Sequence, residues 1–405
     1  MAADPERRGP LMAAVTVRDL LPADAAEALL VGRVWDPESG GPRVVAVRGG
    51  NVVDLTGTVL TVSELLESED PAATAAAAEG EARWTLEELV DASWKRDASR
   101  AHLLAPIDLQ VVKACGVTFV ESMVERVIEE RCGGDFNRAA EVRRTVGAAL
   151  GGSITSLRPG SEAARQAKEV LLAESMWSQY LEVGLGPDPE VFTKAPVLSA
   201  VGFGADIGIP TFSSWNNPEP ELVLAVDSAG RVRGATLGND VNLRDVEGRS
   251  ALLLGKAKDN NASAAIGPFI RLFDASFTLE DLRAEEIVLE VRGEDGYVLE
   301  GRNNVGRISR PFEELVEATH GAHHQYPDGF VLFTGTLFAP TQDRDTPGLG
   351  FTHKPGDSVS IRSSHLGALV NRTGVTEELA PWTFGLGSLF SYLRGLEPAR
   401  KGALT

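Results

Sequence analysis

The 405-residue sequence contains only two cysteines, Cys115 and Cys132. That number allows one disulfide at most, which excludes a scaffold built on disulfides. Long apolar runs are also missing, since no uncharged stretch approaches the roughly 18 residues of a membrane-spanning helix. Residues 11–17 form a short apolar run, but it ends at Arg18-Asp19 and not at a small-residue cleavage site. We therefore expect a cytoplasmic protein with reduced thiols and no membrane partner.

Basic residues are in short supply, with 39 Lys and Arg against 58 Asp and Glu and a formal net charge of −19. A chain this acidic repels phosphates at long range, which argues against nucleic acid and anionic membranes as partners. The hydrophobic fraction of 43% is that of a folded protein and excludes general disorder. The charge still allows a local site for a divalent cation.

The common catalytic signatures are absent. The sequence has no H-E-x-x-H and no G-x-S-x-G, and no G-x-G-x-x-G joins a strand to a helix. Gly255-Lys256 is followed by Ala257 and lacks the first glycine of a P-loop. These absences argue against a zinc protease, a serine hydrolase, a nucleotide hydrolase and a dinucleotide-dependent enzyme.

The chain divides by composition near residue 100. Residues 28–62 alternate in hydrophobicity as short strands do, and residues 67–82 have the composition of a solvated, low-complexity connection. After about residue 190, short β-rich runs alternate with turns rich in Gly, Pro, Asn and Asp. We expect an α+β protein with a small β-rich N-terminal domain, residues 1–100, and one larger domain, residues 101–405.

One helix is well marked by its periodicity. Thr118 and Glu121 have the spacing of a capping box, and apolar residues then recur with the period of a helix. These are Val120, Met123, Val124, Val127 and Ile128. The pattern predicts a helix over 118–132 whose polar face carries Ser122, Glu125 and Glu129, and it leaves open whether this helix acts as a lid. Further helices are expected at about 137–150 and 161–181.

A group of carboxylates indicates a metal site. Glu219 and Glu221 are two residues apart, so on a strand both side chains point to one face, and Asp240 follows another β run. Three carboxylates that converge from two strands would form an oxygen site suited to Mg²⁺ or Mn²⁺. Lys258 could neutralise them or hold a substrate oxyanion. The simpler interpretation, a solvated Glu-x-Glu on an acidic protein, stays open from the residues alone.

A set of motifs in fixed order makes this site more specific. The motifs are NPEPEL, GNDVNLRD, GKAKDNN, IGPF, FTGT and GFTHKPGDSVSI, spread over about residues 105–385. In this order they resemble the fumarylacetoacetate hydrolase superfamily. LAPIDLQVVKACGVTF, WSQYLEVGLGPDPEVFTK and RDTPGLGFTHK extend the resemblance to its 2-keto-3-deoxy-pentonate dehydratases.

This resemblance implies a mixed β-sandwich roll, a bound Mg²⁺ ion with Mn²⁺ as an alternative, and a homodimer or homotetramer. It assigns the metal ligands to Glu219, Glu221 and Asp240, and the active-site lysine to Lys258. Arg244 and Thr336 match residues that contact substrate. The substrate would be a small anionic 2-keto acid, 2-keto-3-deoxy-D-xylonate, and the product 2,5-dioxopentanoate.

The sequence departs from the hydrolytic members of the superfamily at one position. Those members carry a His-x-x-Glu pair that activates water, and here the pair is Ser122 and Glu125. Loss of the imidazole argues against C–C hydrolysis and leaves Glu125 as a candidate base for the C3 proton. Ser122 would then only bind substrate or water. An acylpyruvate-type hydrolase, an oxaloacetate decarboxylase and a non-catalytic carboxylate-binding protein remain the alternatives, and neither the substrate enantiomer nor the residue that acts as acid is fixed.

Overall fold

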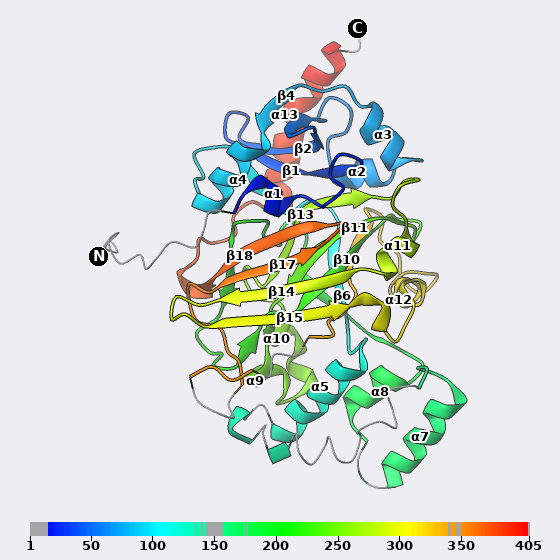
Figure 1. The fold of residues 1–405 in the computed structure, drawn as a ribbon. Coiled ribbons are helices and arrows are strands. Elements are labelled where there is room, and N and C mark those ends of the chain that lie inside the picture. Colours follow the sequence, from blue (N-terminus) through cyan, green and yellow to red (C-terminus); the bar gives the residue numbers. More distant parts are fainter. Residues whose placement is uncertain are drawn as a thin grey trace.

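Strands from the N-terminal and central parts of the chain join one large sheet (Figure 1). The computed structural model describes residues 15–133, 135–138, 141–142, 157–173, 175, 177–338, 342–345 and 350–403. The strands of the large sheet are β1 Leu30–Asp36, β2 Gly41–Arg48, β3 Asn51–Asp54, β4 Ala82–Thr85, β5 His102–Leu104, β6 Val111–Gly116, β7 Glu190–Ala195, β10 Pro220–Val226, β11 Val232–Asp240, β13 Ala264–Leu272 and β16 Phe330–Phe333. Their hydrogen-bonded order is β4-β3-β2-β1-β13-β11-β10-β16-β6-β7, with β5 paired to β1.

A second, five-stranded sheet covers one face of the first. It has the order β15-β14-β17-β18-β8 and consists of β8 Asp206–Ile209, β14 Glu286–Arg292, β15 Val298–Asn304, β17 Ser358–Ser363 and β18 Gly367–Val375. β18 lies against β13, β17 against β11, and β14 against β10. Parallel pairs β16–β6 and β18–β8 stand among antiparallel ones, so both sheets are mixed. The expected packed, mixed β architecture is confirmed.

Strand β10 shows why the centre of the large sheet is apolar on both faces. Leu222, Leu224 and Val226 point into the core shared with the second sheet, while Val223 and Ala225 point into a separate core on the other side. Both faces of the strand are therefore buried, and its sequence is a continuous apolar run. This buried hairpin of β10 and β11 carries Glu221 and Asp240, two of the candidate metal ligands.

The N-terminal strands are continuous with this sheet, because β1 pairs antiparallel with β13. The division into domains at residue 100 stays a prediction. Residues 67–82, expected to be a solvated connection, are in part a helix, α3 (Pro71–Ala77), whose Ala72 and Ala75 are buried. Asp70 caps this helix and Pro71 is its first residue. This part of the segment is therefore a helix packed against the core and not a solvated linker.

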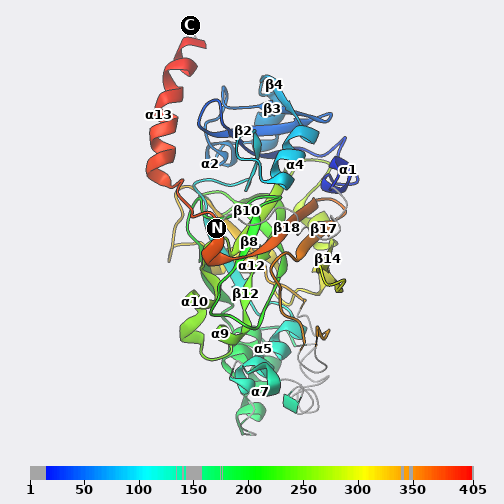
Figure 2. The ribbon, with the colours of Figure 1, turned by 90° about the vertical axis from the view of Figure 1, so that its left-hand side faces the viewer.

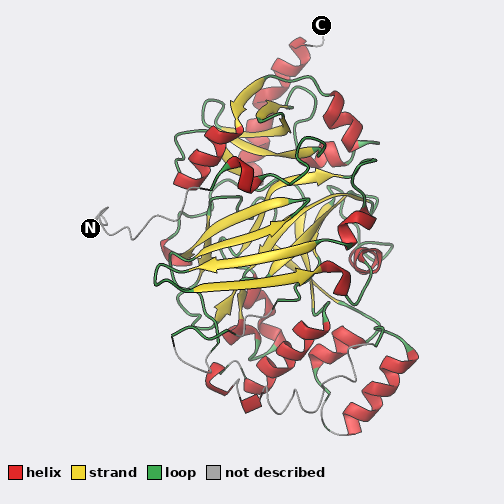
Figure 3. Ribbon diagram, in the orientation of Figure 1, coloured by secondary structure: helices red, strands yellow, loops and turns green. Residues whose placement is uncertain are grey.

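Helices gather at the end of the sheets opposite the N-terminal strands (Figure 3). They are α5 Val120–Cys132, α7 Glu162–Ala173, α8 Gln179–Leu185, α9 Arg244–Glu247 and α10 Leu254–Lys258. Elsewhere lie α1 Val17–Leu20, α2 Val62–Leu66, α4 Leu86–Lys95, α11 Leu279–Arg283 and α12 Phe312–Thr319. The helix expected at about 137–150 falls mostly outside the described residues.

Helix α5 confirms the predicted helix but not its cap. Phe119 precedes the first turn and forms no side-chain cap, because the Thr118 hydroxyl donates to the Thr334 carbonyl at 2.7 Å. Met123, Val127 and Ile128 are buried as expected. The capping-box prediction was wrong because the Thr118 hydroxyl bonds to the loop after β16 and not to the first turn of the helix.

The last helix, α13 (Leu386–Ala403), runs along the N-terminal strands and extends past them (Figure 2). The ring of Phe384, just before it, meets Trp35 edge-on at 5.2 Å, and Tyr392 lies 3.2 Å from the Ser39 hydroxyl. In the described part of the chain, no helix has the length and apolar character needed to span a membrane.

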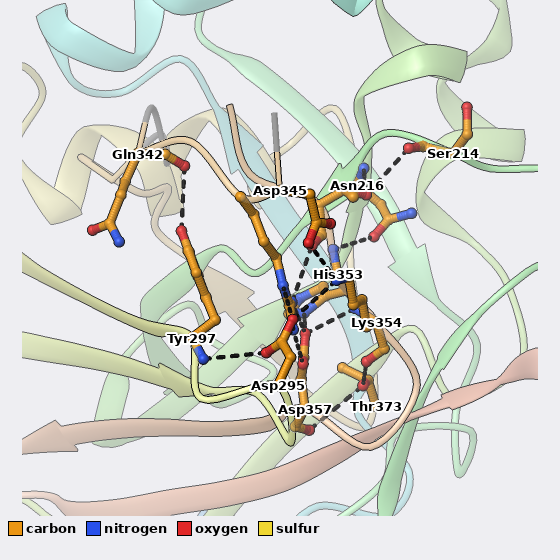
Figure 4. A network of polar contacts seen from close by, with 12 residues as sticks. Ser214, Asn216, Asp295, Tyr297, Gln342, Asp345, His353, Lys354, Asp357 and Thr373 are labelled. Carbon is orange, nitrogen blue, oxygen red and sulfur yellow. Dashed lines mark hydrogen bonds and ion pairs between the residues drawn. The ribbon is translucent and has the colours of Figure 1, made fainter. Parts of the chain in front are cut away.

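A polar network ties the segment after residue 342 to the second sheet (Figure 4). Arg344 binds both carboxylate oxygens of the buried Asp357, at 2.7 and 2.8 Å, and also Asp295 at 3.0 Å. Lys354 joins Asp295 to Asp345 closer to solvent. The bidentate pair with Asp357 fixes this segment because neither charge is accessible to water.

We predict that Arg344→Met lowers the free energy of unfolding by about 3 kcal/mol, because it leaves the Asp357 carboxylate buried without its cation. Chemical denaturation followed by circular dichroism measures the change. Lys354→Met is the matched control, expected to cost less than about 1 kcal/mol because its partners are partly exposed. Equal losses in the two variants would contradict this role of the buried pair.

Candidate metal centre

Three buried carboxylates converge where β10 begins and β11 ends. Glu219 precedes β10, Glu221 is its second residue, and Asp240 is the last residue of β11. The antiparallel register places Pro220 opposite Asn239, which brings the two strand ends together. One carboxylate oxygen from each residue lies within 4.8 Å of the others. The sequence predicted this cluster, and the structure brings its three members together.

These carboxylates fit a divalent cation. Burial, followed by the charges of Asp240 and Glu219, raises the pKa of Glu221 well above its ordinary value. A cation bound among the three groups would remove this repulsion, and carboxylate oxygens are the ligands that Mg²⁺ and Mn²⁺ prefer. The Gly335 N–H donates to Glu221 at 2.6 Å and orients its carboxylate. Gly335 has a φ of +92°, and a Cβ there would meet the Thr118 hydroxyl at 2.0 Å, so the loop requires glycine.

Two buried lysines flank the cluster. Lys258, the last residue of α10, lies 2.5 Å from Glu219 and 3.0 Å from Asp240. Although burial opposes it, the charges of Asp240 and Glu219 hold the pKa of Lys258 above its ordinary value. Lys194 of β7 approaches Asp240 from the other side at 2.7 Å and donates to the Val241 carbonyl at 3.0 Å. The predicted lysine is in place, and sequence reasoning missed the second one.

Helix α5 contributes a chain of ion pairs beside the three carboxylates. Arg126 binds Glu219 directly, and it also binds Glu129 at 2.6 Å and Glu247 at 2.9 Å. The second oxygen of Glu129 binds Arg244 at 2.6 Å. Glu129, on the predicted polar face of the helix, is therefore buried between two arginines.

Two adjoining pockets lie over these groups, and together they are called the cavity, with an inner and an outer lobe. The inner lobe, with an empty volume of about 320 Å³, contains the three carboxylates, Lys258 and Glu190 in its lining. The outer lobe, of about 230 Å³, contains Glu125, Arg244 and Asn217. The two lobes share Ser122, Arg126, Glu219 and Thr336. The two lobes therefore lie next to each other.

Glu190 is the functional candidate that the sequence analysis did not name. Burial, followed by the charge of Glu247, raises the pKa of Glu190 to about 7. A carboxyl group that titrates near neutrality beside a metal cluster is suited to donate or accept a proton. Alternation along β7 puts Glu190 on the same side as Phe192 and Lys194, a signal that was present in the sequence.

The remaining predicted residues all lie on the cavity. Thr336 follows Gly335 and lines both lobes, while the Ser122 hydroxyl donates to the Phe119 carbonyl at 2.9 Å. Arg244 stacks over the Trp215 ring at 4.4 Å and lies 3.4 Å from Glu125. Glu125 lines the outer lobe and not the inner one. Its assignment as the C3 base stays a prediction.

The comparisons with known proteins agree with this geometry. Residues 181–373 match the family model described as fumarylacetoacetate (FAA) hydrolase C-terminal. This range contains Glu190, the three metal-site carboxylates and Lys258, and it leaves α5 outside.

Two curated relatives share about half of the chain. The sequence is 34% identical over 182 residues to the 2-dehydro-3-deoxy-D-arabinonate dehydratase of Saccharolobus solfataricus. It is 32% identical over 197 residues to the probable 2-keto-3-deoxyxylonate dehydratase of Haloferax volcanii. The matches cover 45% and 49% of this chain and 57% and 64% of the relatives, so each spans less than two thirds of the relative's own length.

Solved structures share the fold over a longer span. A 2-keto-3-deoxy-D-arabinonate dehydratase in its apo form aligns with 86% of this chain and 99% of its own, with a TM-score of 0.61. Its form complexed with magnesium and 2,5-dioxopentanoate aligns with a TM-score of 0.57. Both are 22% identical to this chain, so the likeness establishes the fold alone.

We predict that Mg²⁺ stabilises the protein, by about 2.7 kcal/mol at a concentration 100 times its dissociation constant. Glu221→Gln should abolish this response because it removes one ligand. The metal-free variant should be at least as stable as the metal-free wild type, because a neutral amide avoids the burial and repulsion that raise the pKa of Glu221. Thermal unfolding with and without Mg²⁺ measures both effects.

Glu130→Gln is the matched control for this experiment, since Glu130 lies on α5 and lines neither lobe of the cavity. It should keep the full response to Mg²⁺. An undiminished response in Glu221→Gln would show that the cation binds elsewhere.

Proposed function

We propose, from the match of residues 181–373 to the fumarylacetoacetate (FAA) hydrolase C-terminal family model, that the protein is a Mg²⁺-dependent sugar-acid dehydratase. The proposed reaction converts 2-keto-3-deoxy-D-xylonate, which is the same compound as 2-dehydro-3-deoxy-D-arabinonate, into 2,5-dioxopentanoate. Mn²⁺ is the alternative metal. The observation that carries the proposal is the buried cluster of Glu219, Glu221 and Asp240 beside Lys258 and the titratable Glu190.

The names of the relatives support the choice of reaction. The two curated relatives are named as dehydratases of 2-keto-3-deoxy-pentonates, and the solved neighbour was captured with magnesium and 2,5-dioxopentanoate. The position that is histidine in hydrolytic members is Ser122, whose hydroxyl is bonded to its own helix. A serine in this state is a poor base for activating water, which favours elimination over C–C hydrolysis.

The chain's own residues divide the reaction between them. A cation held by Glu219, Glu221 and Asp240 would act as a Lewis acid that polarises the C2 carbonyl of the substrate. Lys258, cationic and buried, holds the negative charge that develops on the C2 oxygen. Thr336 binds the C1 carboxylate at the junction of the two lobes.

Two glutamates are available for the proton transfers. A base removes a C3 proton, and Glu125 is the candidate that the sequence predicts. Glu190, protonated below about pH 7, delivers a proton to the C4 hydroxyl, which leaves as water. Loss of a C5 proton and tautomerisation then give the C5 aldehyde, so that one molecule of water is lost overall.

The site also accounts for an anionic substrate on an acidic protein. Lys258 and Arg244 both lie on the cavity, and a divalent cation held by Glu219, Glu221 and Asp240 would add two positive charges. A homodimer or homotetramer and a cytoplasmic location belong to the same proposal.

We predict that the purified protein with Mg²⁺ converts one 2-keto-3-deoxy-pentonate enantiomer into 2,5-dioxopentanoate, followed by NMR of the aldehyde. EDTA should abolish turnover and added Mg²⁺ should restore it. Glu190→Gln should lower kcat about 10²–10⁴-fold as expected for a positioned acid, while Glu130→Gln should not change it. Cleavage of acylpyruvates or decarboxylation of oxaloacetate in place of dehydration would overturn the proposal.

The same assay tests the base. If Glu125 removes the C3 proton, Glu125→Gln should also lower kcat about 10²–10⁴-fold with the fold intact. If Glu125→Gln keeps near-normal turnover while Glu190→Gln loses it, Glu125 is not the base. Both proton transfers would then be made by groups of the inner lobe.

We predict that kcat/KM falls as the pH rises through about 7. Glu190 acts as an acid only when protonated, and its pKa of about 7 sets where that form is lost. The residual activity of Glu190→Gln should lack this fall. If Glu190→Gln shows the same fall in kcat/KM near pH 7 as the wild type, another group is responsible for that fall.

A further inference from the structure

One buried acceptor on the cavity has no partner of any kind. Among the described residues, three cavity-lining side chains have a buried oxygen without a hydrogen bond, namely Asp240, Glu247 and Asn217. Asp240 and Glu247 form ion pairs with Lys194 and Arg126 through those same oxygens. Asn217 Oδ1 has neither kind of contact, and a buried acceptor left in this state costs about 1–3 kcal/mol.

The orientation of this amide is fixed by its other atom. Asn217 Nδ2 donates to the Pro218 carbonyl at 2.8 Å. Only the NH₂ end of the amide can make this bond, so Oδ1 cannot exchange places with it. Asn217 is 2% exposed, so bulk solvent hardly reaches its oxygen, and the residue is part of the lining of the outer lobe.

The neighbouring Asn216 shows the difference between a structural amide and this one. Asn216 Oδ1 accepts from the His353 N–H at 3.2 Å, and its Nδ2 donates to the Ser213 hydroxyl at 3.2 Å. Figure 4 shows this side chain beside His353, within the network around Asp357. Both polar atoms of the Asn216 side chain form hydrogen bonds within the protein, whereas in Asn217 only Nδ2 does.

The two ends of the proposed substrate differ in what they can offer this oxygen. The C1 carboxylate and C2 carbonyl carry acceptors, which suit the cation, Lys258 and Thr336. The hydroxyl groups at C4 and C5 are the donors. Asn217 is two residues from the metal ligand Glu219, about 7 Å along an extended chain, a distance that a five-carbon acid anchored at C1 and C2 can span. The C4 hydroxyl leaves in the reaction, which makes the retained C5 hydroxyl the donor for a fixed acceptor.

We propose that Asn217 is a specificity-determining residue whose Oδ1 accepts a hydrogen bond from the C5 hydroxyl of the substrate. The inference rests on the proposed dehydratase function. It assigns the outer lobe to the distal hydroxyl and makes Asn217 the residue that separates a hydroxylated sugar acid from a shorter or deoxygenated keto acid. A site built to accept from a substrate hydroxyl discriminates strongly against an analogue that lacks it.

The test is a two-substrate cycle in the Mg²⁺-loaded protein. The substrates are 2-keto-3-deoxy-D-xylonate and 4-hydroxy-2-oxopentanoate, which can lose the C4 hydroxyl but has no C5 hydroxyl. Asn217→Leu should lower kcat/KM for the first substrate about tenfold or more and leave kcat/KM for the second nearly unchanged. The ratio of the two kcat/KM values is the measured quantity, because a general loss of folding or of metal lowers both.

Two further variants make the result specific. Asn217→Asp keeps acceptor oxygens at this position, so its ratio should stay close to that of the wild type even if both rates fall. Asn216→Leu removes an amide that the protein itself uses, and its ratio should also match the wild type. An equal loss on both substrates in Asn217→Leu would overturn the assignment to the C5 hydroxyl. Absence of water loss from either substrate in the wild type would instead overturn the dehydratase function.

Discussion

Mutual repulsion among buried carboxylates is the constraint on which the site depends. Glu219, Glu221 and Asp240 stand within a few ångströms of one another with almost no exposure to water. Charges of one sign in such a place are unstable unless cations share it. Lys258 and Lys194 supply two cations, and Arg126 supplies a third that it shares with Glu129 and Glu247. The raised pKa of Glu221 reflects the repulsion that remains. A bound divalent ion would offset it.

The fold holds these groups in place without relying on flexible loops. The β10–β11 hairpin is buried on both faces, so the strand ends that carry the three carboxylates cannot move apart without opening two apolar cores. β7 and α10 bring the lysines, and α5 brings Arg126 and Glu129. Glu129 of α5 pairs with Arg244 of α9, and Arg126 of α5 pairs with Glu247 of α9. Because Arg126 also binds Glu219, the position of α5 and the geometry of Glu219 belong to one ion-pair network.

Much of the site could be predicted from local sequence. The period of two put Glu219 and Glu221 on one face, and the hairpin pattern brought Asp240 to them, because strand alternation and turn chemistry are local properties. Lys258 was a candidate from its charge, but its assignment as the active-site lysine needed the resemblance, since its distance along the chain from Asp240 carries no geometry by itself. Glu190 and Lys194 alternate on β7 in the same way, but nothing local shows that β7 faces the metal cluster.

Other expectations were wrong because tertiary contacts override local patterns. The spacing of Thr118 and Glu121 is that of a capping box, yet the threonine bonds to the Thr334 carbonyl on a distant loop. Residues 67–82 have a solvated composition, yet Asp70 and Pro71 start a helix that packs on the sheet. Glu129 lies on the polar face of its helix and is buried there, since that face meets arginines and not water.

The most direct test of this account is the position of a bound divalent ion. Mn²⁺ has an anomalous X-ray signal, so diffraction from crystals grown with it locates the ion independently of any assay. The account predicts one strong anomalous peak in contact with carboxylate oxygens of Glu219, Glu221 and Asp240. A peak at another site, or none among these three residues at saturating Mn²⁺, would contradict it.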